Sequence, residues 1–177
     1  MKKYAVGVDV GGTNIKLGIF EEEGGLLEKW EIPTVTEEGP EAIFKNIAYS
    51  LQDTFQRRGI QQEEVLGIGL GVPAAVTADG HMAKAVNVGW DEMEPAKKLE
   101  ELLHIPVTAA NDANVAAFGE MWKGAAKGCS NVVMVTLGTG VGGGIIANGE
   151  ILTGATGGGG EIGHIHVNDD EAESCNC

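Results

Sequence analysis

Glycine is distributed unevenly along this chain of 177 residues, and its clusters constrain the fold more than any other feature. Between Leu137 and Gly163, 12 of 27 positions are glycine. A smaller group comprises Gly7, Gly11, Gly12 and Gly18. A flexible linker is the alternative interpretation, but linkers lack flanking β-branched runs such as residues 132–135. We therefore expect places where the backbone turns sharply or approaches a ligand closely.

The hydrophobic pattern predicts an α/β fold with a mixed sheet. Predicted strands are Tyr4–Asp9, Ile15–Phe20, Leu26–Ile32, Val65–Val72, Ile105–Ala109, Val132–Leu137 and Gly142–Ala147. Predicted helices run from Pro40 to near Gly59, over Ala96–His104 and over Asp112–Lys123. The length of 177 residues allows one ample domain or two small ones.

The first glycine cluster forms a hairpin with polar residues around its turn. A Gly-Gly turn between apolar strands is by default only a hairpin. That default leaves Asp9, before Gly11 and Gly12, and Thr13, after them, unexplained. Backbone N–H groups that glycine leaves exposed can bind an anion, and the Thr13 hydroxyl can donate to a phosphate oxygen. Asp9 can hold Mg²⁺ or a water molecule bound to it.

A second turn, Gly138-Thr139-Gly140, repeats this pattern between two predicted strands. It is not a Walker loop, because no Gly-Lys-[Ser/Thr] opens a helix. It is a poor dinucleotide fingerprint, because the sequence continues as a strand. Two such turns together suggest one loop for each end of a triphosphate.

Asn111-Asp112-Ala113-Asn114 lies between the two hairpins. Asn or Asp before an apolar helix commonly serves as its N-cap, which explains one polar residue better than three. An Asp at the carboxyl end of a sheet strand lies where α/β folds bind ligands. Asp112 could accept a proton from a substrate hydroxyl while Asn111 binds a neighbouring one.

The third cluster is a run of glycines followed by Glu161, His164 and His166. In a strand, His164 and His166 would face one way and Glu161 the other. His164 together with Cys175 and Cys177 gives three of the four ligands of a tetrahedral zinc site, with His166 a rival ligand.

Charge and cysteine content narrow the functional classes. With 12 Lys+Arg and 26 Asp+Glu the formal net charge is −14, which argues against a nucleic-acid-binding surface. Three cysteines without framework spacing argue against a secreted disulfide scaffold. No signal peptide and no apolar run of about 18 residues is visible. We expect a cytoplasmic protein without nucleic-acid or membrane partners.

Four motifs in order resemble the ROK family (repressors, open reading frames and sugar kinases). They are Asp9-x-Gly-Gly-Thr13, Asn111-Asp112-x-Asn114, Leu137-Gly-Thr-Gly-x-Gly-Gly-Gly144 and Glu161-x-Gly-His164 with the following Cys-x-Cys. The stretches 119–126 and 142–150 most resemble the bacterial glucokinases of that family. The resemblance implies the actin-like ATPase (ribonuclease H-like) fold, with two α/β domains around a cleft, here residues 1–110 and 111–177.

The resemblance also implies roles for single residues. Asp112 would be the catalytic base that activates a hexose hydroxyl, most simply in converting glucose to glucose 6-phosphate with Mg·ATP. The implied sugar contacts are Asn87, Asn111, Glu161 and His164. The implied ATP phosphate contacts are Gly11, Gly12, Thr13, Gly138, Thr139 and Gly140. His164, Cys175 and Cys177 would ligate a structural zinc, and a homodimer is implied by the family alone.

Three alternatives stay open. Relatives phosphorylate N-acetylhexosamines, mannose, fructose or allose. Others are sugar-sensing transcription repressors, but those carry a helix-turn-helix before the first hairpin, for which no room is seen before Tyr4. Finally, the family continues beyond Cys-x-Cys with a segment that this chain lacks after Cys177. We therefore expect a truncated second domain, an incomplete zinc site and weak or no activity.

Overall fold

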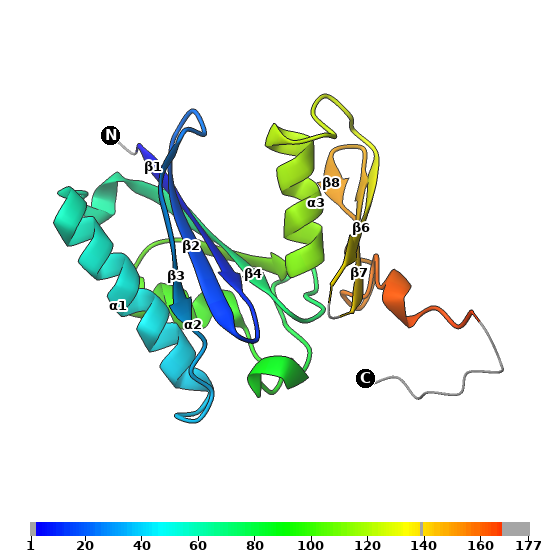
Figure 1. Cartoon of the computed structure of the whole chain (residues 1–177), viewed down its shortest axis with the longest axis horizontal. Helices are drawn as coiled ribbons and strands as arrows, with labels where there is room; N and C mark the ends of the chain where they lie inside the picture. Colours follow the sequence, from blue (N-terminus) through cyan, green and yellow to red (C-terminus); the bar gives the residue numbers. More distant parts are fainter. Residues whose placement is uncertain (1–2, 139, 168–177) are drawn as a thin grey trace.

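A computed structural model describes residues 3–138 and 140–167 (Figure 1). Its strands are β1 (Tyr4–Val10), β2 (Asn14–Glu21), β3 (Leu26–Pro33), β4 (Val65–Val72), β5 (Val107–Asn111), β6 (Val132–Leu137), β7 (Val141–Ala147) and β8 (Glu150–Ile151). Its α-helices are α1 (Pro40–Arg58), α2 (Pro95–Leu103) and α3 (Asp112–Lys123). Short 3₁₀ helices are η1 (Gln62–Glu64), η2 (Val86–Val88) and η3 (Ile162–His164).

Within the described residues the strands form two sheets, one of five strands in the order β3-β2-β1-β4-β5 and one of three in the order β6-β7-β8. In the larger sheet β1, β4 and β5 are parallel, and β2 and β3 extend it as antiparallel strands. The carboxyl ends of β1, β4 and β5 therefore meet at one edge of the sheet, where open α/β sheets bind ligands.

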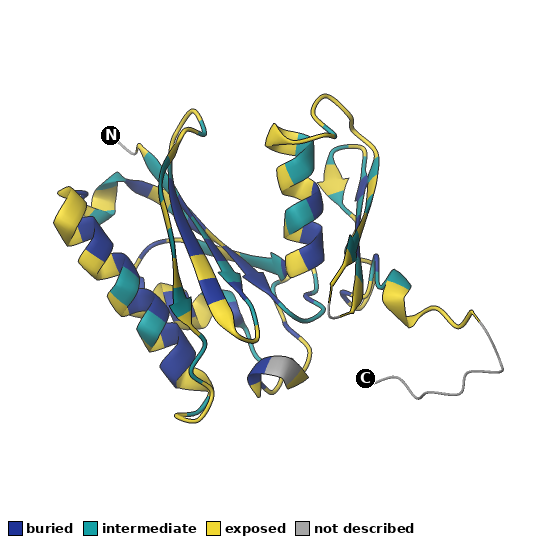
Figure 2. Cartoon of the chain, in the orientation of Figure 1, coloured by how far each residue is buried: buried dark blue, intermediate teal, exposed yellow. Residues whose placement is uncertain are grey.

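One face of the five-stranded sheet forms the main core (Figure 2). Side chains alternate along a strand, so Ile15, Leu17 and Ile19 of β2 all point into this core and are buried. The α1 helix covers the face with the apolar stripe that the sequence predicts, which consists of Ile43, Ile47, Leu51 and Phe55. Helix α2 adds Leu99 and Leu103.

The opposite face of the five-stranded sheet is turned toward α3, which lies between the two sheets (Figure 1). Helix α3 packs closely on β7 because two strand residues beneath it lack side chains. A Cβ on Gly144 would lie 2.5 Å from the Ala113 carbonyl oxygen and 2.7 Å from the Ala117 Cβ. A Cβ on Gly142 would lie 3.4 Å from the Ala113 Cβ. Gly142 and Gly144 of the second glycine cluster therefore allow close packing of α3 on β7.

Most predicted elements are confirmed within a residue or two, including α3 and β6 at both ends. The segment 161–167 is different, because it contains η3 where the alternation of its side chains was compatible with a strand. Gly157 and Gly160 before it have φ of 81° and 90°, a backbone conformation that strand residues do not adopt.

None of the helices in the described part of the chain has the length and apolar character that a membrane span requires.

Alanine substitution of two glycines associated with helices should change the free energy of unfolding in opposite directions. Gly59 caps α1 with φ 67°, so Gly59→Ala should lower the free energy of unfolding by about 1 kcal/mol. Gly119 lies inside α3 with no atom within 4 Å of the place its Cβ would take. Gly119→Ala should raise that free energy by about 0.5–1 kcal/mol. Urea unfolding of both variants checks the two signs. A lower free energy of unfolding in Gly119→Ala would contradict the finding that a Cβ at this position meets no neighbouring atom.

Candidate active site

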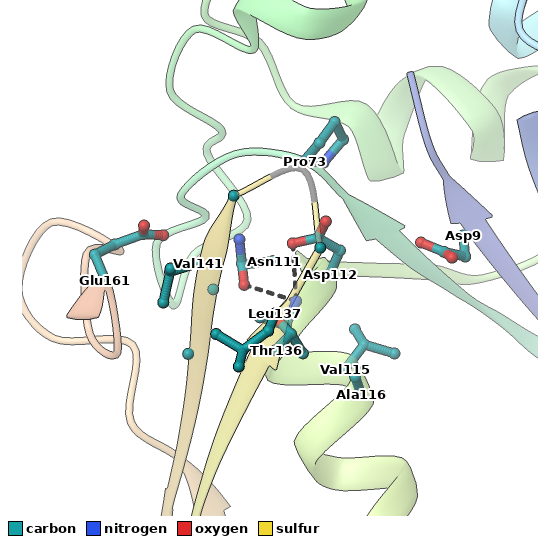
Figure 3. Close-up of a pocket in the computed structure, with 15 residues that line it drawn as sticks. Asp9, Pro73, Asn111, Asp112, Val115, Ala116, Thr136, Leu137, Val141 and Glu161 are labelled. Atoms are coloured by element: carbon teal, nitrogen blue, oxygen red, sulfur yellow. Dashed lines mark hydrogen bonds between the residues drawn. The ribbon is translucent and has the colours of Figure 1, made fainter. Parts of the chain in front are cut away.

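An open cleft of about 620 Å³ lies at the carboxyl edge of the five-stranded sheet (Figure 3). Its walls come from the end of β1, the β5–α3 junction, the β6–β7 hairpin and the segment before η3. Among its described lining residues, Asp9, Asp112 and Glu161 are carboxylates and none is Lys, Arg or His. The cleft wall is therefore acidic and suits a ligand that arrives with a cation.

Asp9 occupies this edge because it is the next-to-last residue of β1. It pairs with Lys16 on β2 and with Gly71 on β4. The Lys16 Nζ lies 3.7 Å from the Asp9 Oδ2, and both side chains are largely solvated. Lys16 thus places a positive charge directly beside the acidic wall of the cleft, although it is not a lining residue itself.

Asn111 ends β5 and caps α3. Its Oδ1 accepts hydrogen bonds from the backbone N–H groups of Ala113, at 3.0 Å, and Asn114, at 3.1 Å. Its Nδ2 donates to the Ala74 carbonyl oxygen at 3.4 Å, a long bond. The N-cap interpretation is therefore correct for Asn111. Asn111 also lines the cleft, so its Nδ2 is placed where it could contact a substrate hydroxyl. That contact stays a prediction.

Asp112 is the first residue of α3 and points into the cleft (Figure 3). Its Oδ1 accepts a hydrogen bond from the Ala113 N–H at 2.8 Å. Desolvation by the surrounding protein raises the pKa of Asp112, the negative charge of Asp9 raises it further, and the Ala113 N–H opposes both. A raised pKa makes this carboxylate a better proton acceptor than an ordinary aspartate.

Gly71 on β4 lies between the two carboxylates. A Cβ at this position would lie 3.5 Å from the Asp9 Oδ1 and 3.8 Å from the Asp112 Cα. The absence of a side chain on this buried residue therefore lets both Asp9 and the start of α3 lie close to β4. Sequence reasoning gave Gly71 no role, because its place depends on strand register.

The second glycine hairpin forms the wall across from Asp9. Gly138 and Gly140 line the cleft, and the Gly138 N–H donates to the Gly140 carbonyl oxygen at 3.0 Å. No atom lies within 4 Å of the place a Cβ would take on either glycine. These two glycines are open to a ligand, in contrast to the packed Gly142 and Gly144.

Glu161 lines the cleft from the segment before η3, and His164 lies beside it with Nε2 3.7 Å from the Glu161 Oε2. His164 itself is not among the lining residues, and no three described His, Cys, Asp or Glu residues are grouped as a metal site. Cys175 and Cys177 lie outside the described residues, so of the predicted zinc ligands the structure places only His164.

The remaining predicted site residues are placed less directly. Gly11, Gly12 and Thr13 form the β1–β2 turn, which borders Asp9 but does not line the cleft. Asn87 belongs to η2, but its side chain lies outside the described part of the chain, as does Thr139.

Sequence reasoning missed Lys16 and Gly71. Lys16 could have been found, since a cation seven residues after Asp9 falls on the same face if a tight hairpin joins the strands. Nothing local distinguishes Gly71 from Gly69 two residues earlier.

The sequence profile of the ROK family matches residues 5–177. The chain belongs to the ROK family. The sequence of this ROK protein is 48% identical to a glucokinase of Halalkalibacterium halodurans over 99% of this chain and 53% of the relative. It is also 31% identical to the xylose repressor of Bacillus subtilis, over 98% of this chain and 45% of the relative.

Solved structures place this ROK protein in the actin-like ATPase fold. It superimposes on a ROK glucokinase from Streptomyces griseus, in complex with glucose and AMPPNP, with a TM-score of 0.83 and 34% identity. That match covers 96% of this chain and 52% of the other. The chain thus spans about half the length of the relatives it matches.

Proposed function

We propose that the protein catalyses ATP-dependent phosphorylation of a hexose, glucose to glucose 6-phosphate, in the cleft between Asp9 and the β6–β7 hairpin. The observation that carries this proposal is the position of Asp112, a carboxylate of raised pKa that faces an open glycine turn. The 48% identity to a glucokinase and the likeness to a structure holding glucose and AMPPNP support the choice of substrates.

Asp112 acts as the general base in this proposal. It accepts the proton of the glucose 6-hydroxyl as that oxygen forms a bond to the γ-phosphorus of ATP. The bond from the γ-phosphorus to the β,γ-bridging oxygen breaks in line, and ADP leaves with the electron pair. Phosphoryl transfer depends mainly on positioning and charge stabilisation, so holding Asp112 at a helix N-terminus beside the phosphate turn is the main contribution.

The two glycine turns, at residues 11–13 and 138–140, hold the ATP phosphates through backbone N–H groups other than those of Gly11 and Gly138, which donate to the Asn14 and Gly140 carbonyl oxygens. The acidic wall suits a nucleotide bound with Mg²⁺, which would be held from Asp9 and would neutralise charge on the transferred phosphoryl group. Lys16, beside Asp9, adds a second positive charge near the same phosphates.

The sugar side of the site is proposed from the remaining polar residues. Asn111 and Glu161 line the cleft and would bind sugar hydroxyls. His164 lies next to Glu161, and Asn87 is carried over from the family motif. An N-acetylhexosamine, mannose or fructose is the alternative substrate in the same cleft.

Further parts of the proposal rest on the family resemblance. They are a two-domain division at 110/111, a zinc site of His164, Cys175 and Cys177, a homodimer, a cytoplasmic location and a role in glycolysis. β5 ends at Asn111 and α3 begins at Asp112, so the proposed division falls within one residue of a change of element.

A substrate panel tests the proposed reaction. Because the chain spans about half the length of its relatives, ADP formation is measured for the chain alone and for a chain extended to the length of those relatives. Each assay contains ATP, Mg²⁺ and one sugar at a time: glucose, N-acetylglucosamine, mannose or fructose. We expect glucose to give the highest kcat/KM, and a higher value for another sugar would reassign the substrate. ADP formation that no sugar stimulates in the extended chain would contradict the reaction itself, whereas weak or no turnover is expected of the 177 residues alone. Glu37→Gln, an exposed carboxylate in the loop before α1, serves as a control that retains full activity.

The pH profile should reflect the raised pKa of Asp112. The base form exists above this pKa, so kcat/KM falls as the pH drops through it. Because the pKa is raised, that acidic limb should lie above the ordinary aspartate value of about 3.9. Rates measured from pH 4 to 8 at constant ionic strength check this, and an acidic limb at the ordinary value would contradict it.

A sugar-sensing repressor is the second candidate, because of the 31% identity to the xylose repressor. The net charge of −14 disfavours a DNA-binding surface on this chain. Glucose binding without any phosphoryl transfer by a chain extended to the length of its relatives would favour this alternative.

A further inference from the structure

The C-terminal end of α3 contacts the five-stranded sheet about 15 Å along the helix from Asp112. The rings of Trp122 on α3 and Phe20 on β2 meet edge to face, with centroids 6.4 Å apart and an interplanar angle of 65°. The next residue, Lys123, donates from Nζ to the Glu23 carbonyl oxygen in the β2–β3 turn at 3.3 Å. Figure 1 shows that turn and this helix end on the same side of the molecule.

Three glycines shape the sheet side of this contact. Gly7 and Gly18 are direct partners on β1 and β2, and the Phe20 ring lies 3.5 Å and 3.1 Å from the places their Cβ atoms would take. Gly24, in the β2–β3 turn, has φ 82°, and a Cβ there would overlap the Trp122 ring. Gly7 and Gly18 belong to the N-terminal glycine group but not to the phosphate turn, so this contact gives them a role.

Helix α3 meets the glycine-rich face of the sheet at its other end too, where the Asp112 Cα lies close to Gly71. Gly69, on the same face of β4, is exposed, and the nearest atom to the place of its Cβ is the Val6 carbonyl oxygen at 3.9 Å. At these two positions of β4, therefore, no side chain is present to fix the angle of α3. The Trp122 contact is well placed to fix it.

We propose that Trp122 is a positioning residue that braces α3 against Phe20 and the β2–β3 turn, and so fixes how Asp112 faces Asp9 across the cleft. The effect on α3 does not depend on the reaction. Its catalytic consequence rests on the proposed role of Asp112.

The orientation of α3 tests the brace directly. Backbone N–H residual dipolar couplings of the 177-residue chain report the angle between α3 and the five-stranded sheet. In Trp122→Ala, couplings within the sheet and within α3 should each still fit the structure, while the two sets require a new relative orientation. Trp122→Phe keeps a ring and should retain the original orientation. Phe118→Ala, which removes another exposed aromatic residue of α3, is the matched control.

Gly24→Ala provides a second route, because it displaces Trp122 from the sheet without removing it. It should reorient α3 as Trp122→Ala does. An unchanged orientation in both variants, or an equal change in Phe118→Ala, would overturn the brace.

Turnover tests the catalytic consequence separately. Displacing a catalytic group by about 1 Å costs on the order of 100-fold in rate. We expect Trp122→Ala to lower kcat by roughly 10- to 100-fold with little change in the KM for glucose, and Trp122→Phe to restore it. A reoriented helix with unchanged kcat would refute positioning. Absence of turnover in the unsubstituted chain extended to the length of its relatives would instead count against the proposed function, while the dipolar couplings would still decide the brace.

Discussion

Asp112→Asn should lower kcat for glucose phosphorylation by on the order of 10²–10⁴, the usual contribution of a general base. The substitution keeps the size and shape of the side chain, and its amide oxygen can still accept the bond from the Ala113 N–H that Asp112 Oδ1 accepts at 2.8 Å. What is lost is the basic oxygen that takes the hydroxyl proton. Steady-state rates with saturating Mg·ATP and glucose measure the effect, and a near-wild-type kcat would remove Asp112 from this role.

The same substitution should not weaken the fold, which separates a catalytic from a structural effect. A raised pKa means that the folded protein holds the Asp112 proton more tightly than the unfolded chain does. The fold is therefore favoured as the pH falls through that pKa, and the ionised carboxylate costs stability at pH 7. Neutral Asn removes this cost, so the urea midpoint of Asp112→Asn at pH 7 should equal or exceed that of the wild type.

Gly144→Ala should destabilise the protein more than alanine at Gly59 or Gly138. Its Cβ would lie 2.5 Å from the Ala113 carbonyl oxygen and 2.7 Å from the Ala117 Cβ. Neither a backbone oxygen nor a buried helix residue can move aside cheaply, so α3 must shift away from β7. At the upper end of overpacking costs, the free energy of unfolding should fall by about 3 kcal/mol. Thermal unfolding should show Tm lower by roughly 5–10 °C.

Gly138→Ala is the matched control for Gly144→Ala, because the two glycines belong to one cluster in the sequence. No atom lies within 4 Å of the place a Cβ would take on Gly138. Gly138→Ala should leave Tm nearly unchanged and raise the KM for ATP. Equal destabilisation by both substitutions would contradict the division of this cluster into open and packing glycines.

Elements with a clear periodic pattern could be predicted from the sequence. Helix α3 is predictable at both ends, because Asn111 supplies an N-cap and Gly124 follows Lys123. The convergence of Asp9 and Asp112 was partly predictable, since both stand at the ends of apolar strand patterns. The ROK family was predictable because its motifs are local in sequence.

Features that depend on register or on the third dimension could not be predicted. Gly71 separates Asp9 from Asp112 only because β4 pairs in parallel with β1 in one particular register. Gly142 and Gly144 look like phosphate-loop residues until α3 is seen to lie on them. The alternation of side chains after Gly160 was compatible with a strand, but the segment contains a 3₁₀ helix and follows two glycines with positive φ, Gly157 and Gly160, which side-chain alternation does not indicate.

A crystal structure of this protein with glucose and AMPPNP, in the presence of Mg²⁺, tests the central claim most directly. If Asp112 is the general base, a glucose 6-hydroxyl lies within roughly 2.6–3.2 Å of its carboxylate. The γ-phosphate should lie beside the turn at residues 138–140, on the side that faces Asp9. Glucose bound away from Asp112, or a nucleotide whose phosphates do not contact that turn, would contradict it.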